Sequence, residues 1–134
     1  MKTSILLLLF TSLNFIAFSQ TKSYKSSTTI VEKKEFKTES VERTLFLTEN
    51  SITISNYLNG GKDDAKMKIN KIEKKEYSLD GVCNWYYCTS TVKDPIIGYS
   101  KFIIIIPEHA TSVYIFHFAD EVSVYSSQLL INPY

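Results

Sequence analysis

Short apolar runs of strand length, separated by turn signals, are the feature of this sequence that most restricts its fold. The runs lie two to eight residues apart, and no amphipathic pattern of ten or more residues indicates a helix. Connections this short favour antiparallel neighbours, because a parallel crossover needs a dozen or more residues. The sequence therefore predicts an all-β fold, an antiparallel meander of seven or eight strands. A small closed barrel and a two-layer sandwich both satisfy this pattern.

The centre of the predicted sheet is the most apolar stretch that follows the N-terminal segment. Residues Phe102–Ile106 are apolar at every position, which is typical of a strand covered on both faces. Residues Val113–Phe118 form the neighbouring strand, and this strand carries His117. We expect these two strands to be scaffold, with binding at the edges and loops around them.

Residues Ala65–Leu79 fit two interpretations. Met67 and Ile69 share one parity, but Ile72 departs from it. A bulge near Asn70 and Lys71 reconciles this pattern with one long bent strand. A two-turn helix is the alternative, and we favour the strand.

The chain divides into an N-terminal segment and one domain. Residues 1–19 match a signal peptide, with a positive start, an apolar run over Ile5–Phe10, and small residues at Ala17 and Ser19. This apolar stretch is too short and too polar to span a bilayer well, so we expect no stable membrane insertion after cleavage. Residues 20–27 are predicted to be a flexible leader and residues 28–134 a single β domain. The protein is thus expected to be secreted or periplasmic.

Charge gives no reason to expect an anionic polymer as partner. The whole chain has a formal net charge of +1. Removal of residues 1–19 removes one lysine, Lys2, and no acidic residue, so 14 basic and 14 acidic side chains remain. A balanced surface gives no long-range attraction to nucleic acid, so no nucleic-acid partner is expected.

The two cysteines, Cys83 and Cys88, are expected to be unbridged. An even number of cysteines in an exported protein normally suggests a disulfide. In one extended strand, however, five residues separate them by about 16 Å and place them on opposite faces. A disulfide needs Cα atoms within about 7 Å. A strand over Val82–Thr91 therefore excludes an internal bridge.

Catalytic and metal-binding patterns are weak in this sequence. Zinc-type spacing of cysteine and histidine is absent, as is a glycine-rich phosphate loop, so no metal or cofactor is expected. The best candidate for catalysis is His117 acting with Cys88 or with the adjoining Asp120 and Glu121, as in a small hydrolase or thiol-dependent enzyme. We expect instead that His117 is a partly buried structural residue and that the protein is not an enzyme.

The adjacent aromatic residues Trp85, Tyr86 and Tyr87 are the one feature that suggests binding. Alternation places Trp85 and Tyr87 on one face of a strand and Tyr86 on the other. Outward rings could stack on a sugar or anchor a partner, and inward rings could line an apolar cavity, as in lipocalin-like barrels. The same rings could simply fill the core. The leading hypothesis is a binding or interaction module for a small apolar ligand, a glycan or a protein partner. A structural accessory subunit of an envelope complex is a further alternative.

Overall fold

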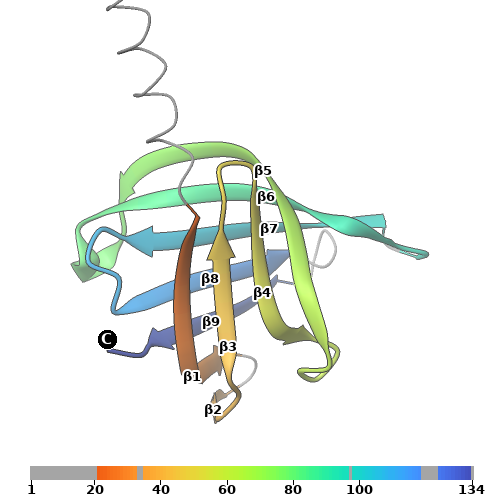
Figure 1. The fold of residues 1–134 in the computed structure, drawn as a ribbon, viewed down its shortest axis with the longest axis horizontal. Coiled ribbons are helices and arrows are strands. Elements are labelled where there is room, and N and C mark those ends of the chain that lie inside the picture. Colours follow the sequence, from red (N-terminus) through yellow and green to blue (C-terminus); the bar gives the residue numbers. More distant parts are fainter. Residues whose placement is uncertain (1–20, 33–34, 97, 119–123, 134) are drawn as a thin grey trace, which may run out of the picture.

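The structure is a computed structural model that describes residues 21–32, 35–96, 98–118 and 124–133. Within these ranges the chain forms nine antiparallel strands, eight of which close into a barrel (Figure 1). Closure comes from β1 and β9, where Thr29 lies opposite Leu129. The elements are β1 (Lys22–Glu32), β2 (Phe36–Glu39), β3 (Arg43–Leu47), β4 (Ser51–Leu58), β5 (Asp63–Glu76), η1 (a 3-10 helix, Ser78–Asp80), β6 (Val82–Asp94), β7 (Gly98–Pro107), β8 (Ser112–Phe118) and β9 (Val124–Ile131).

The barrel confirms the all-β antiparallel prediction and decides between the two architectures that the sequence left open. Each strand from β3 to β8 pairs with the strand that follows it in the chain, as in a meander. The ninth strand, β2, is additional: among the described residues it pairs with β1 alone.

The interior of the barrel is a packed apolar core. Successive side chains of a strand point to opposite faces, so every second residue faces inward. Leu45, Ile54 and Ala65 lie opposite one another on β3, β4 and β5, and all three are buried. The core cluster comprises Leu45, Leu47, Ile52, Ile54, Ala65, Met67, Tyr86, Cys88, Phe102, Ile104, Ile106, Val113, Ile115 and Leu129.

A second, smaller apolar layer lies outside the barrel wall. Ile105 has the outward parity on β7 but is 0% exposed. Its cross-strand neighbours are Trp85 on β6 and Tyr114 on β8. The ring of Tyr77 lies 5.7 Å from that of Trp85 and 4.7 Å from that of Tyr114. Tyr77 thus bridges the two neighbours of Ile105. With Ile104 fully buried on the inner face, the prediction that this strand is covered on both faces is confirmed.

β5 is the long bent strand that the sequence favoured. The register between β5 and β6 shifts between Ile69 and Lys71, which places the bulge at the predicted position. The helical alternative for this segment is wrong. After β5 the chain turns through η1 and through Gly81, whose φ of +73° lies in the left-handed region that favours glycine.

The prediction of a flexible leader over residues 20–27 is wrong for residues 22–27. Residues 22–27 belong to β1, whose first half pairs with β3 from Lys22 opposite Leu47 to Ser26 opposite Arg43. The polar composition was misleading because strand pairing satisfies the backbone whatever the side chains are. The second half of β1 is not an edge strand, because it pairs with β2 and with β9.

The short strand β2 is fixed to the barrel by a buried arginine. The Nη1 of Arg43 donates to Thr29 Oγ1 at 2.6 Å, and its Nε donates to the carbonyl of Asn56 at 2.9 Å. The remaining nitrogen, Nη2, lies 3.7 Å from Oε1 of Glu39 on β2. The guanidinium also lies over the ring of Tyr57, 5.7 Å from its centroid. These contacts join β2 to β1, β3 and β4.

Both cysteines are free and buried, as the strand geometry predicts. Cys88 points into the core, whereas Cys83 faces the outer layer near Tyr77. Burial raises the pKa of the Cys88 thiol to about 12.

The predicted signal peptide, residues 1–19, lies outside the described residues. Among the residues that the structure does describe, we find no helix with the length and apolar character needed to cross a membrane.

Candidate binding groove on the outer face

The three aromatic residues singled out from the sequence point to two faces, as alternation predicts. Tyr86 faces inward, is 7% exposed and belongs to the core cluster. Trp85 and Tyr87 face outward and are half-buried. The indole Nε1 of Trp85 is buried and has no hydrogen-bond partner among the described residues. Tyr86 therefore fills the core, and only Trp85 and Tyr87 are available to the outer surface.

A charged cluster from β5 covers these two outward rings. The Nζ of Lys75 lies 4.7 Å from the Trp85 ring centroid and donates to the Tyr87 hydroxyl at 2.7 Å. Glu73 forms ion pairs with Lys71 and with Lys75, the second at 3.0 Å. Hydrogen bonds from Lys71 and Lys75 lower the pKa of Glu73. Because these groups satisfy one another, Trp85 and Tyr87 do not present a free aromatic patch.

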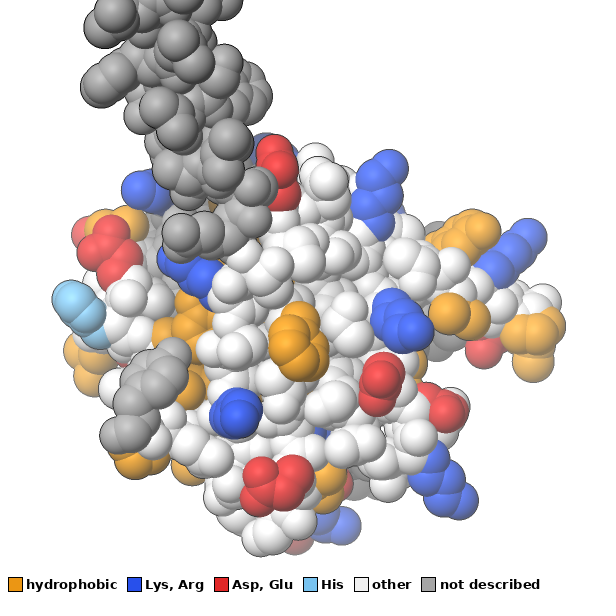
Figure 2. All heavy atoms as spheres, in the orientation of Figure 1, with side chains coloured by type: hydrophobic (Ala, Val, Ile, Leu, Met, Phe, Trp, Pro, Cys, Tyr) orange, Lys and Arg blue, Asp and Glu red, His pale blue; other side chains and the backbone are white. Residues whose placement is uncertain are grey.

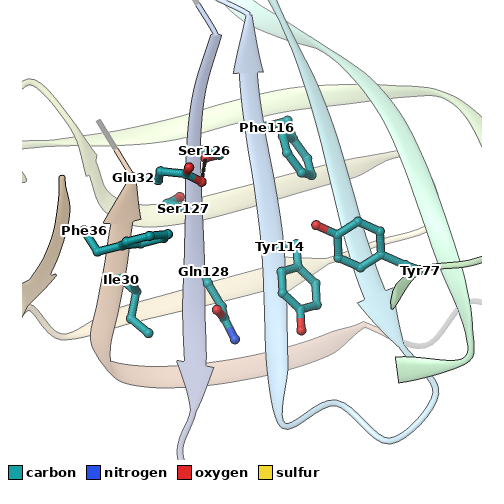
Figure 3. A pocket seen from close by; sticks show the side chains of 9 residues that line it. All are labelled: Ile30, Glu32, Phe36, Tyr77, Tyr114, Phe116, Ser126, Ser127 and Gln128. Atoms are coloured by element: carbon teal, nitrogen blue, oxygen red, sulfur yellow. Dashed lines mark hydrogen bonds between the residues drawn. The ribbon is translucent and has the colours of Figure 1, made fainter. Parts of the chain in front are cut away.

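A hollow on the outer surface lies over the seam where β9 meets β1 (Figure 3). We call it the seam groove. It has a volume of about 160 Å³. It is lined by Ile30, Glu32, Phe36, Tyr77, Tyr114, Phe116, Ser126, Ser127 and Gln128.

A small residue on β9 creates the hollow. Ser126 lies directly opposite Glu32 on β1 and directly opposite Phe116 on β8. Neighbouring strands are about 4.8 Å apart, so the two larger residues stand roughly 10 Å apart at the backbone with only a hydroxymethyl group between them. The result is a floor of low side chains between two higher walls.

One wall of the seam groove is aromatic. The rings of Tyr77 and Phe116 lie 6.4 Å apart at 80°, and those of Tyr77 and Tyr114 lie 4.7 Å apart at 57°. The Tyr114 hydroxyl donates to Oδ2 of Asp80 at 2.5 Å, which links β8 to η1. Burial, followed by this bond, raises the pKa of Tyr114 to about 12. This wall is therefore preorganised, because its rings contact one another and one of them is bonded to the η1 turn.

The opposite wall combines an apolar ring with a carboxylate. Figure 3 shows Phe36, Ile30 and Glu32 on one side of β9, with Tyr77, Tyr114 and Phe116 on the other. The Phe36 ring is 75% exposed, so most of its surface is open to solvent at this wall. Glu32 accepts a hydrogen bond from the Ser126 hydroxyl at 3.1 Å, which orients the carboxylate over the floor.

The described lining of the seam groove carries one formal charge, the Glu32 carboxylate. Among the residues that the structure describes, no lysine, arginine or histidine lines it. Burial, and then the negative charges of Asp80 and Glu32, raise the pKa of Tyr77. Two carboxylates therefore act on the same ring. On the floor, the Gln128 amide nitrogen donates to the Ser112 hydroxyl at 2.8 Å.

Two further hollows lie elsewhere on the barrel. One, of about 300 Å³, lies where the β4–β5 and β6–β7 hairpins diverge, and it includes Phe102 and His117. The other, of about 370 Å³, lies beside Tyr87 and Phe118. The β6–β7 hairpin projects from the barrel (Figure 1), and Figure 2 shows apolar side chains on it; the exposed ones include Val92, Ile96 and Tyr99.

The structure does not bring His117 and Cys88 together. Phe102 lies opposite Cys88 on one side and opposite His117 on the other, so it separates them. The imidazole stacks on the Phe102 ring with centroids 4.3 Å apart and planes parallel within 1°. Burial lowers the pKa of His117. The other predicted partners, Asp120 and Glu121, lie outside the described residues. In the part of the chain that the structure describes, no group of three or more His, Cys, Asp or Glu could hold a metal ion.

Comparison with known proteins returned no match: no family model, no curated protein and no solved structure is similar to this chain. The site must therefore be interpreted from its own chemistry.

Sequence reasoning did not find the seam groove. Its aromatic residues come from three separated segments, around Phe36, Tyr77 and Tyr114, and closure of the barrel brings these segments together. One signal was present: Tyr114 and Phe116 share one parity of a strand whose other parity carries Val113 and Ile115. Such a strand is covered on both faces or carries a functional surface.

Proposed function

We propose that this chain is an exported binding module that takes its ligand in the seam groove on the outer face of the barrel. The observation that carries the proposal is the aromatic wall of Tyr77, Tyr114 and Phe116 facing the Glu32 carboxylate across a floor of small residues. Binding sites commonly combine a rigid apolar surface with a few polar groups that fix orientation. Export rests on the signal-peptide pattern over residues 1–19.

An outer site fits this barrel better than a lipocalin-like interior site. Away from the hollow beside Phe102 and His117, the inward positions are filled by the packed core cluster, to which Tyr86 also contributes its ring. A ligand inside would have to displace close-packed side chains, at a cost of several kcal/mol. Binding on the outer face leaves the core intact.

A substitution that fills the groove tests the proposal. In Ser126→Trp the indole would occupy the space between Glu32 and Phe116. A panel of neutral saccharides, organic ammonium compounds and short peptides is screened against the purified protein by ligand-observed NMR. We expect at least one class to bind at millimolar concentration and to lose binding in Ser126→Trp. The intact mass of the secreted protein tests cleavage after the signal segment in the same preparation.

Two further variants make the test specific. Phe36→Ala removes an exposed ring from the second wall without touching the core, so it should weaken the same binding while the protein remains folded. Thr53→Trp is the matched control, because Thr53 lies on β4 between Phe46 and Lys66, away from the groove. Binding that survives in Ser126→Trp, or no binding by any class, would contradict the proposal.

A further inference from the structure

The seam groove has a composition that selects among ligand classes. Three aromatic rings stand on one wall, and the other wall carries the Phe36 ring and a single carboxylate, Glu32. The face of an aromatic ring carries partial negative charge, so it attracts cations at short range. The aromatic rings and the carboxylate of the described lining therefore all favour a positive ligand.

The surrounding charges agree with this polarity. Glu32 lines the groove, and Asp80 is bonded to the Tyr114 hydroxyl at its border. Both carboxylates act on Tyr77. By contrast, the cations around the other outward rings, Lys71 and Lys75, are already paired with Glu73. The seam groove differs because the part of its lining that the structure describes includes no cation.

The size of the groove limits what can enter. A volume of about 160 Å³ is below the roughly 300–1,000 Å³ of sites that enclose a drug-sized molecule. A small chemical group at one end of a molecule fits this volume better than a whole large ligand does. Glu32 accepts one hydrogen bond from Ser126 and keeps its negative charge, so it can neutralise a cation that donates no hydrogen bond of its own.

We infer that the seam groove binds a substituted ammonium group, such as the trimethylammonium group of choline, between its aromatic wall and Glu32. This inference rests on the proposed function, since it assigns the ligand chemistry of the same groove. Recognition of alkylated ammonium by aromatic rings needs several ring faces around the cation, and a carboxylate adds Coulomb attraction.

The test compares choline chloride with 3,3-dimethyl-1-butanol, which has the same shape but no charge. Trp85 is the only tryptophan of the chain and its ring contacts Tyr77, so its fluorescence reports occupancy of the groove. Titrations are run at constant ionic strength with sodium chloride. We expect saturable choline binding that is about tenfold tighter than binding of the neutral alcohol.

Matched variants locate the effect. Glu32→Gln keeps the shape and the hydrogen-bond acceptor but removes the charge, and it should weaken choline binding about fivefold. Glu49→Gln makes the same charge change in the exposed β3–β4 turn and should leave binding unchanged. Protein that binds free choline and also sediments with phosphatidylcholine vesicles would identify a lipid headgroup as the source; protein that stays in solution would indicate a free small molecule.

The outcomes separate this inference from the proposed function. Equal binding of choline and the alcohol, both abolished by Ser126→Trp, would overturn the inference and leave the groove as a binding site. The absence of saturable choline binding would overturn it as well, and the saccharide and peptide classes would then decide the proposed function. Choline binding that is insensitive to Glu32→Gln and to Ser126→Trp would overturn both.

Discussion

At the scale of single residues, burial determines the reactivity of the two cysteines, whichever face of the strand they occupy. Cys88 and Cys83 lie five residues apart on one strand, yet Cys88 faces the core and Cys83 the outer layer. Burial raises the pKa of both thiols, that of Cys88 to about 12. The thiolate is the reactive form, so both groups should be inert in the folded protein.

Thiol labelling tests this placement. At pH 8 the native protein should react with iodoacetamide at neither cysteine within an hour, because the thiolate is a small fraction and access is blocked. In urea without reductant, intact mass should show two labels. Rapid labelling of Cys88 in the native state would contradict its place in the core, and fewer than two labels in urea would indicate a disulfide that the structure lacks.

At the scale of elements, the turn between β5 and β6 forms one wall of the site. Tyr77 covers Ile105 from outside and contacts Trp85, Tyr114 and Phe116. The strand segments themselves were predictable, because bulge position and alternation are local properties of β5 and β6. The contact between this turn and β8 was not predictable, since it joins Tyr77 to residues almost forty positions away.

Removal of the Tyr77 ring should therefore destabilise the protein. We expect Tyr77→Ala to lower the free energy of unfolding by about 3 kcal/mol, the range of large aromatic truncations against a packed surface. The emission of Trp85 should shift to the red as its ring gains solvent. Tyr77→Phe is the control: it keeps the ring, so urea unfolding should change by less than about 1 kcal/mol. Equal effects of the two changes would mean that the hydroxyl, and not the ring, stabilises the turn.

At the scale of the whole molecule, closure of the barrel creates the site. β1 and β9 stand at opposite ends of the domain in sequence, and their pairing places Glu32 beside Ser126. The sequence predicted antiparallel strands but left barrel and sandwich open, because both satisfy the same alternation. It also assigned part of β1 to a flexible leader, since Lys22–Ser27 has few apolar residues and only distant pairing orders it. The groove depends on the pairing of β1 with β9, which joins segments far apart in the sequence. Sequence reasoning therefore did not identify its residues.

We propose that ligands bind outside the barrel at the β9–β1 seam, and not in its core or in the hollow between the diverging hairpins. The most direct measurement is an NMR titration of amide shifts in the isotope-labelled protein with the tightest probe of the panel. We predict that the largest shifts fall on Glu32, Phe116, Ser126 and Gln128, while core residues such as Ile104 and Ile115 remain unchanged. Shifts concentrated at Ala65, Phe102 and His117 would place binding at the diverging hairpins and contradict the account.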